Sequence, residues 1–369
     1  MTPNNTFLPS ALKNVPSPAK IKEHLDQFVI GQEEAKKTLS VAVYNHYRRL
    51  QLSSDPQNKN KWPLGKSNVL LMGNTGCGKT HLVNTIARFL NVPCYIQDCT
   101  KITASGYVGS DVEDCLAGLL RNCNYDVARA EMGIIMLDEV DKTHKAEAGV
   151  SVTRDVSGEC VQQSLLKIVE GDIVGVPPMG GRKHPEQSLL YVNTSNILFI
   201  ASGAFVGLED IIRKRTEKST GTIGFGGVQL KSKTDKTPVL SRLLPDDLHH
   251  YGMIPEFVGR FPVSTYVEPL DKKDLVRILT EPSDAVITQY QQLLAMDGID
   301  LKFTKGALEA IAETALKIGT GARALRCVIE KVMRDVMFDA PSRKTSGTKE
   351  FVVTEPLVNN KITQFLNVG

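Results

Sequence analysis

The chain has 369 residues, of which 41% are hydrophobic, and this length predicts two or three domains with ample room for a buried core. Its 44 lysines and arginines nearly balance its 41 aspartates and glutamates, so the net charge of +3 excludes a strong whole-chain attraction to nucleic acid or anionic lipid. No apolar run approaches the roughly 18 residues that a membrane-spanning helix needs, which excludes a membrane-embedded protein.

The first residues predict an extended lead-in. Residues 1–17 are polar and rich in proline, and they lack the basic and apolar segments of a targeting peptide, so we expect a cytoplasmic protein. The seven cysteines are an odd number without a CxxC pair, which indicates reduced thiols and argues against a structural zinc site.

The segment 18–267 predicts a large α/β domain. Apolar spacing over 18–50 fits two amphipathic helices joined at residues 29–32. Short, unbroken apolar runs then alternate with helical stretches, and such runs are typical of strands covered on both faces. The runs are 69–72, 93–96, 134–137 and 197–200. This alternation predicts a parallel sheet flanked by crossover helices.

After residue 269 the pattern becomes mainly helical. Amphipathic helices are predicted over 271–294 and 306–316, and a third follows one face from Ala322 to Val336. A β-like run at 351–353 follows. The segment 268–369 therefore predicts a smaller, mostly helical α+β domain.

A glycine-rich loop between a predicted strand and a predicted helix carries the clearest chemistry. It matches the pattern GxxxxGK[ST] and consists of Gly73, Asn74, Thr75, Gly76, Cys77, Gly78, Lys79 and Thr80. Such a loop wraps a phosphate chain with its backbone N–H groups at a helix N-terminus. Lys79 is predicted to contact the β- and γ-phosphates and Thr80 to ligate Mg²⁺. The alternative is a glycine-rich turn that opens an ordinary helix.

Two acids end the third apolar run. Asp138 suits the Mg²⁺ shell, and Glu139 suits the orientation or deprotonation of an attacking water. Alone, two such acids are more often simply solvated. Together with the upstream phosphate loop they predict hydrolysis of ATP or GTP.

These motifs give the chain a resemblance to the ClpX family of AAA+ unfoldases, the ATPase partners of ClpP peptidases. The resemblance covers the chain from about residue 18 to its end. The matching segments are 29–32, 73–80, 106–109, 137–139, 153–159, 181–184, 223–226, 255–260 and 321–323.

The resemblance implies a homohexamer that binds ATP between its subunits. Val29 and Ile30 would flank the adenine, and the nucleotide site would extend from the phosphate loop to His81. Arg260 matches an arginine finger that reaches the neighbouring subunit's site, and Arg323 matches a second-sensor arginine. Ser202 is the candidate for a first sensor at the end of the run 197–200.

The resemblance also assigns substrate and partner loops. Tyr107 and Val108 match a pore loop that grips tagged or unfolded protein substrates. Arg154 matches a second pore loop, and an entrance loop carries Arg182, Lys183 and His184. A segment that docks on a ClpP-type peptidase consists of Ile223, Gly224 and Phe225. Taken alone, each of these could be a packed turn, a solvated basic loop or a local core contact.

The predicted activity is ATP-driven protein unfolding, without peptidase chemistry in this chain. No zinc-binding domain of the kind usual in the family stands before residue 18, which puts zinc binding and adaptor-dependent delivery in doubt. A peptidase-independent remodeller stays open as an alternative. A nucleic-acid motor is disfavoured because the loop 106–109 is uncharged, and the sister unfoldase HslU is disfavoured because the span between Glu139 and Arg260 is short for its inserted domain.

Overall fold

The computed structural model describes residues 14–54, 64–102, 111–143, 158–177, 188–219, 238–345 and 350–366. They form two compact units. The first lies within residues 1–21, 34–74 and 86–267, and the second within 22–33, 75–85 and 268–369. The second unit therefore contains, besides the C-terminal region, a segment near the N-terminus and most of the phosphate loop.

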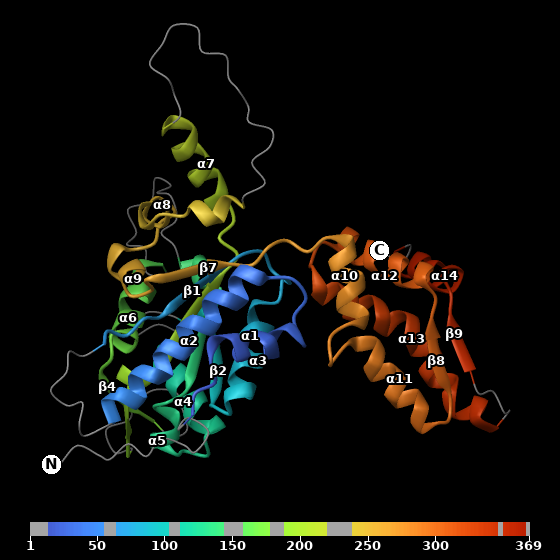
Figure 1. The fold of residues 1–369 in the computed structure, drawn as a ribbon, viewed down its shortest axis with the longest axis horizontal. Helices are drawn as coiled ribbons and strands as arrows, with labels where there is room; N and C mark the ends of the chain where they lie inside the picture. Colours follow the sequence, from blue (N-terminus) through green and yellow to red (C-terminus); the bar gives the residue numbers. More distant parts are fainter. Residues whose placement is uncertain are drawn as a thin grey trace, which may run out of the picture. The chain divides into compact units, whose positions relative to one another are not determined.

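A five-stranded parallel sheet forms the centre of the first unit (Figure 1). Its strands, in spatial order, are β2 (Cys94–Asp98), β3 (Ile134–Asp138), β6 (Leu198–Gly203), β1 (Val69–Met72) and β7 (Val263–Tyr266). All four strand pairs are parallel. The predicted α/β class with a parallel sheet is confirmed. Strand β7 was not predicted, because its sequence Val-Ser-Thr-Tyr lacks the apolar run that identified the others.

Most helices of the first unit lie beside this sheet, whereas those over residues 208–219 and 245–250 lie beyond one end of it (Figure 1). The helices of this unit are α2 (Glu33–Ser54), α4 (Asp114–Asn122), α5 (Val127–Ala130), α6 (Glu159–Val169), α7 (Leu208–Ser219), α8 (Pro245–His250) and α9 (Pro255–Gly259). A short antiparallel pair, β4 (Ile173–Val176) and β5 (Leu190–Asn193), follows α6. Two further helices, α1 (Pro18–Asp26) and α3 (Lys79–Leu90), begin in one unit and end in the other.

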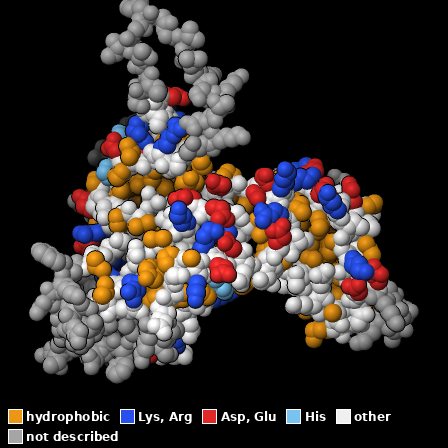
Figure 2. Space-filling model, viewed as in Figure 1, with side chains coloured by type: hydrophobic (Ala, Val, Ile, Leu, Met, Phe, Trp, Pro, Cys, Tyr) orange, Lys and Arg blue, Asp and Glu red, His pale blue; other side chains and the backbone are white. Residues whose placement is uncertain are grey.

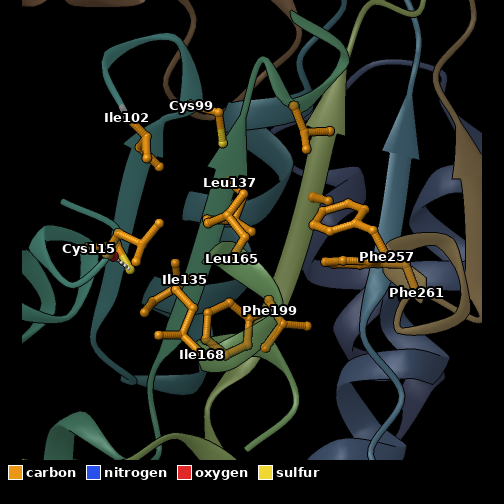
Figure 3. Close-up of a cluster of buried hydrophobic side chains, with 14 of the residues drawn as sticks. Cys99, Ile102, Cys115, Ile135, Leu137, Leu165, Ile168, Phe199, Phe257 and Phe261 are labelled. Carbon is orange, nitrogen blue, oxygen red and sulfur yellow. Dashed lines mark hydrogen bonds between the residues drawn. The ribbon is translucent and has the colours of Figure 1, made fainter. Parts of the chain in front are cut away.

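The core of the first unit fixes the strand that carries the predicted acids. Ile135 and Leu137 project from β3 toward the same side as Phe199 of β6, where Leu165 and Ile168 of α6 cover them (Figure 3). All five side chains are essentially inaccessible to solvent. Burying each such side chain contributes roughly 1.5–3 kcal/mol. The carboxyl end of β3 is therefore held rigidly in place.

The second unit contains the helical C-terminal region. Its elements are α10 (Lys272–Thr280), α11 (Val286–Met296), β8 (Asp300–Phe303), α12 (Lys305–Ile318), α13 (Ala322–Thr345), β9 (Glu350–Val353) and α14 (Glu355–Leu366). The prediction of a single helix over 271–294 is wrong, because α10 ends at Thr280 and α11 begins at Val286. Pro282 lies between them, and its ring nitrogen has no proton to donate to a helical hydrogen bond. Strand β8 was not predicted, and it pairs in parallel with β9.

Three basic side chains secure the turn that leads into β6. Lys66 Nζ donates to the carbonyl oxygen of Thr194 (2.9 Å), and Arg49 Nη2 donates to that of Ser195 (3.0 Å). The ring of His46 lies with Nε2 3.0 Å from the carbonyl oxygen of Asn196, so Nε2 carries the proton. Burial, together with the charges of Arg49 and Lys66, lowers the pKa of His46 to about 3. The imidazole is therefore neutral at physiological pH.

We expect this buried imidazole to make the protein sensitive to acid. Between pH 6.5 and about 3 the unfolded chain binds a proton that folded His46 does not, so the free energy of unfolding falls as the pH is lowered through that window. The slope is up to about 1.4 kcal/mol per pH unit. His46→Gln keeps a donor for Asn196 and removes the titration, so urea unfolding at about pH 7 and about pH 5 should show a loss about 2 kcal/mol smaller in the variant. The exposed His250 replaced by Gln is the control, and an equal loss in His46→Gln and the unmodified chain would contradict the assignment.

Candidate active site

The glycine-rich loop leaves β1 at Gly73 and enters α3 at Lys79, in the strand–loop–helix context that the motif requires. Its conformation depends on Gly76, which has φ +80°. A Cβ at this position would overlap the carbonyl oxygen of Thr320 and press on Gly321. Only glycine is compatible with both the backbone angle and this close approach.

The same loop is hydrogen-bonded to the start of α13. The N–H of Ala322 donates to the carbonyl oxygen of Gly76 over 3.0 Å, and Gly321 takes a left-handed conformation with φ +59°. Arg323, the next residue, is exposed. The structure thus brings the predicted second-sensor arginine to the phosphate loop within the second unit, although a long stretch of sequence separates them.

The segment predicted to flank the adenine belongs to this unit as well. Val29 and Ile30 are buried in the turn between α1 and α2. The side chain of Gln32 fixes this turn: its Nε2 donates to the carbonyl oxygen of Glu268 (2.9 Å), and its Oε1 accepts from the Glu268 N–H (2.7 Å). His81 of α3 lies with Nε2 3.3 Å from the carbonyl oxygen of Phe28. The turn is therefore tied to the helix that follows the phosphate loop.

The loop residues differ in exposure. Asn74 and Thr75 are exposed, Thr80 is half-buried, and the Lys79 side chain is buried. Cys77 is also buried, and burial raises the pKa of its thiol despite the N–H of Leu270 and the charge of Lys79. The thiol consequently stays protonated and acts as a small apolar side chain.

The two predicted acids and the predicted sensor lie together at the carboxyl edge of the first unit's sheet. Asp138 ends β3, and its Oδ1 accepts from the hydroxyl of Ser202 on β6 over 2.5 Å. Asp138 Oδ1 also accepts from the N–H of Glu139 (3.1 Å). The N–H of Gly73 donates to the carbonyl oxygen of Gly203 (3.1 Å), so the phosphate loop starts at the same edge. Among the residues that the structure describes, none donates a hydrogen bond to Asp138 Oδ2.

Two residues at this edge have strained backbones. Glu139 has φ +58° and Phe205 has φ +50°, values that residues other than glycine rarely adopt. Each such residue costs roughly 1–3 kcal/mol and persists where the surroundings determine it. Phe205 is held by Asp141, a residue that was not predicted for the site: Oδ2 of its buried carboxylate accepts from the Phe205 N–H (3.1 Å). Its place three residues after Asp138 was the signal that could have found it.

Arg260 lies at the opposite, amino edge of the same sheet. It follows α9 and precedes β7, and its carbonyl oxygen accepts from Nδ2 of Asn68 just before β1 (2.9 Å). Because the strands are parallel, the residues before β7 lie at the far edge from those that end β3. Within one subunit, Arg260 is therefore separated from Asp138 by the length of the strands.

The residues predicted for substrate and partner contacts fall outside the described part of the chain. They are Tyr107, Val108, Arg154, Arg182, Lys183, His184, Ile223, Gly224 and Phe225. Within the ranges that the structure does describe, no helix is long and apolar enough to cross a membrane. In those same ranges, no three histidine, cysteine or acidic side chains converge as ligands of a metal ion would.

Two family models match the chain. The AAA domain (Cdc48 subfamily) matches residues 65–264, which is more than half of the chain, and the C-terminal, D2-small domain of ClpB protein matches residues 270–353. With the phosphate loop and the acids at the sheet edge, these matches define the class: this is an AAA+ ATPase, and it is not itself a peptidase.

Named relatives define the family. The protein of Treponema denticola named ATP-dependent Clp protease ATP-binding subunit ClpX is 50% identical over 347 residues, 94% of this chain and 82% of that protein. Proteins of the same name from Borrelia duttonii and Borrelia recurrentis are each 51% identical over 350 residues, 95% of this chain and 80% of theirs. The chain belongs to the ClpX family, and the resemblance drawn from its motifs is confirmed.

Proposed function

We propose that this chain hydrolyses ATP in a homohexamer and uses the energy to unfold tagged or unfolded proteins and thread them into a ClpP-type peptidase. The observations that carry the proposal are two hydrogen bonds of the phosphate loop, one within each unit. In the first unit, Gly73 N–H donates to Gly203, the neighbour of Ser202, whose hydroxyl donates to Asp138. In the second unit, the carbonyl oxygen of Gly76 accepts from Ala322, the neighbour of Arg323. The relatives' name, ATP-binding subunit of the ATP-dependent Clp protease, supports both ATP use and the peptidase partner. Cytoplasmic residence, and division into domains 18–267 and 268–369, stay predictions of the sequence.

Each loop residue then has a role toward ATP. The backbone N–H groups between Asn74 and Gly78 would bind the phosphates, and Lys79 would contact the β- and γ-phosphates. Val29 and Ile30 would contact the adenine. Arg323, exposed next to the loop's hydrogen bond with α13, would reach the phosphates and report their presence to the C-terminal region.

The donors present fit a magnesium ion. A hydroxyl from Thr80 and the free Oδ2 of Asp138 are hard oxygen ligands, the type that Mg²⁺ prefers. The ion, when bound, neutralises charge on the phosphates. Ser202 fixes the Asp138 carboxylate by donating to its other oxygen. Glu139, held in its strained conformation directly after Asp138, would orient and deprotonate the attacking water.

Arg260 would complete the site of a neighbouring subunit. Its position at the amino edge of the sheet keeps it from the acids of its own chain. An arginine supplied by a neighbour offsets charge that develops on the transferred phosphoryl group, so hydrolysis would depend on assembly.

The sequence motifs outside the described residues carry the rest of the proposal. Tyr107 and Val108 would grip substrate in the pore by apolar contact, and Arg154 and the basic residues 182–184 would contact incoming chains. The tripeptide 223–225 would dock on the peptidase. Action on nucleic acid is the weaker alternative: acidic and basic side chains are interspersed on the face shown in Figure 2, whereas a nucleic-acid channel requires a basic stripe.

The decisive test is degradation of a stably folded, tagged fluorescent protein. Fluorescence should fall only with ATP, and the loss should become irreversible when a ClpP-type peptidase is present.

Tyr107→Ala should keep ATP hydrolysis and slow unfolding about tenfold or more, because the apolar grip on the substrate is lost. Deleting residues 223–225 should stop degradation and spare unfolding. Degradation that persists after this deletion would contradict the docking role, whereas unfolding without any effect of peptidase would favour a peptidase-independent remodeller.

A further inference from the structure

We infer that Glu170 is a positioning residue that orients Arg260 for the nucleotide of the neighbouring subunit. The inference rests on the proposed function, in which Arg260 acts between subunits, and it adds a residue that neither the motifs nor the family resemblance identified.

The contact uses one edge of the guanidinium group. Nε of Arg260 donates to Oε1 of Glu170 over 2.9 Å, and Nη2 lies 2.7 Å from the same oxygen. Glu170 therefore engages the side edge formed by Nε and Nη2. The end edge, formed by Nη1 and the second proton of Nη2, is not used by Glu170. A guanidinium can bind a phosphate through that end edge with two parallel hydrogen bonds. Glu170 can thus hold the side chain while the arginine contacts a phosphate.

Both residues are mounted on rigid elements. The backbone of Arg260 is held by Asn68, a buried side chain whose Oδ1 also accepts from Phe199 N–H (3.2 Å) in β6. Next to Arg260, the rings of Phe257 and Phe261 lie 4.8 Å apart in the core (Figure 3). Packing therefore determines where the Arg260 backbone stands.

The mounting of Glu170 is equally well defined. Glu170 directly follows α6, and its N–H donates to the carbonyl oxygen of Leu166 (2.9 Å). The preceding carbonyl, that of Val169, accepts from Lys66 Nζ (3.1 Å). With both backbones fixed, the ion pair selects one direction for a side chain that otherwise has many rotamers. A catalytic contact is stronger when the side chain is already oriented before its ligand binds, because little conformational entropy is then lost on binding.

The pair is a poor candidate for a purely stabilising contact. The side chains of Arg260 and Glu170 are 52% and 45% exposed. Exposed pairs of this type contribute little to folding stability, because water screens the two charges and both side chains lose rotamer freedom. Removing the Glu170 carboxylate should therefore leave the fold intact, and any large effect should appear in hydrolysis.

The test is a double-mutant cycle on steady-state ATP hydrolysis by the assembled protein. Glu170→Ala should lower kcat about tenfold, with KM for ATP within about twofold, because the variant's own phosphate loop is untouched. Glu170→Gln should restore most of kcat, since its amide oxygen can accept the same two N–H groups. Arg260→Ala should lose hydrolysis almost completely, and the double variant should match Arg260→Ala, because a positioning residue has no effect once its target is gone.

The control is Glu281→Ala. Glu281 directly follows α10 as Glu170 follows α6, it pairs with Arg277 through Nε and Nη2, and it is 48% exposed. The kcat of the Glu281→Ala variant should equal that of the unmodified protein. If Arg260→Ala hydrolyses ATP normally, the proposed role of Arg260 itself fails. If Arg260→Ala is inactive but Glu170→Ala is unchanged, or faster, the positioning role fails and the faster case identifies Glu170 as a competitor of phosphate. A Glu170→Ala loss that Gln does not restore also overturns the inference, because it would indicate a structural defect.

Discussion

Glu139→Gln is expected to reduce ATP hydrolysis by a factor on the order of 10² or more while ATP still binds. The amide has the shape of the carboxylate but cannot accept the proton of the attacking water. The backbone of residue 139, with its N–H donating to Asp138 Oδ1, does not depend on the side-chain charge. Phosphate release under saturating ATP measures the loss, and binding of a fluorescent ATP analogue checks that affinity changes by less than about threefold.

A second substitution at the same position separates chemistry from strain. Glu139 has φ +58°, a region that glycine enters without steric cost. Glu139→Gly should therefore be as inactive as Glu139→Gln and no less stable than the unmodified chain. Rapid hydrolysis by either variant would remove Glu139 from the mechanism, and strong destabilisation by glycine would indicate that its side chain is structural.

Gly76→Ala is expected to abolish ATP binding, with an affinity loss of about 100-fold or more. The substitution forces a Cβ into a backbone with φ +80° and against the carbonyl oxygen of Thr320. The loop has to move, so the hydrogen bond from Ala322 to residue 76 is lost and the N–H groups proposed to bind the phosphates are displaced with it. Calorimetric titration with ATP or a non-hydrolysable analogue measures the effect.

The matched control for this variant is Gly319→Ala. Gly319 ends α12 with φ +77°, but no atom lies within 4 Å of the position its Cβ would take. The Gly319→Ala variant therefore has the same backbone strain, roughly 1 kcal/mol, but its Cβ does not collide with any neighbouring atom. ATP affinity should stay near normal in Gly319→Ala. An equal loss in both variants would show that strain alone, and not the loop's contact with α13, accounts for the effect.

The strands of the sheet were predictable because their chemistry is local. A run such as residues 134–137 is apolar on both faces, and the acids that follow it mark the strand's carboxyl end. Strand β7 was not predictable in this way, because Ser264 and Thr265 interrupt the apolar pattern and its place beside β1 is determined by backbone pairing. The helix end before Pro282 was not predictable either, because the apolar period continues from α10 into α11.

The candidate site was only partly predictable, for a related reason. A motif names residues that a local chain conformation holds together, such as Lys79 and Thr80. It does not describe contacts between segments far apart in sequence. The hydrogen bonds of Gly76 with Ala322 and of Glu170 with Arg260 depend on how helices and strands pack, and neither leaves a periodic trace. The left-handed conformation of Glu139 is likewise a product of packing around β3.

The exposed native cysteines of the chain allow dyes to be attached to each unit. All seven cysteines are free of disulfides, and two of them, Cys160 and Cys327, are exposed. Cys160 lies on α6 in the first unit, whereas Cys327 lies on α13 in the second, four residues after Arg323. Cys77 of the phosphate loop is buried, and Cys94 is half-buried with a thiol pKa that burial raises to about 12, so neither reacts readily with a maleimide. A maleimide donor and acceptor dye pair would therefore attach with one dye to each unit and leave the loop unmodified, so energy transfer between the dyes could follow the two units through the ATP cycle without any engineered cysteine.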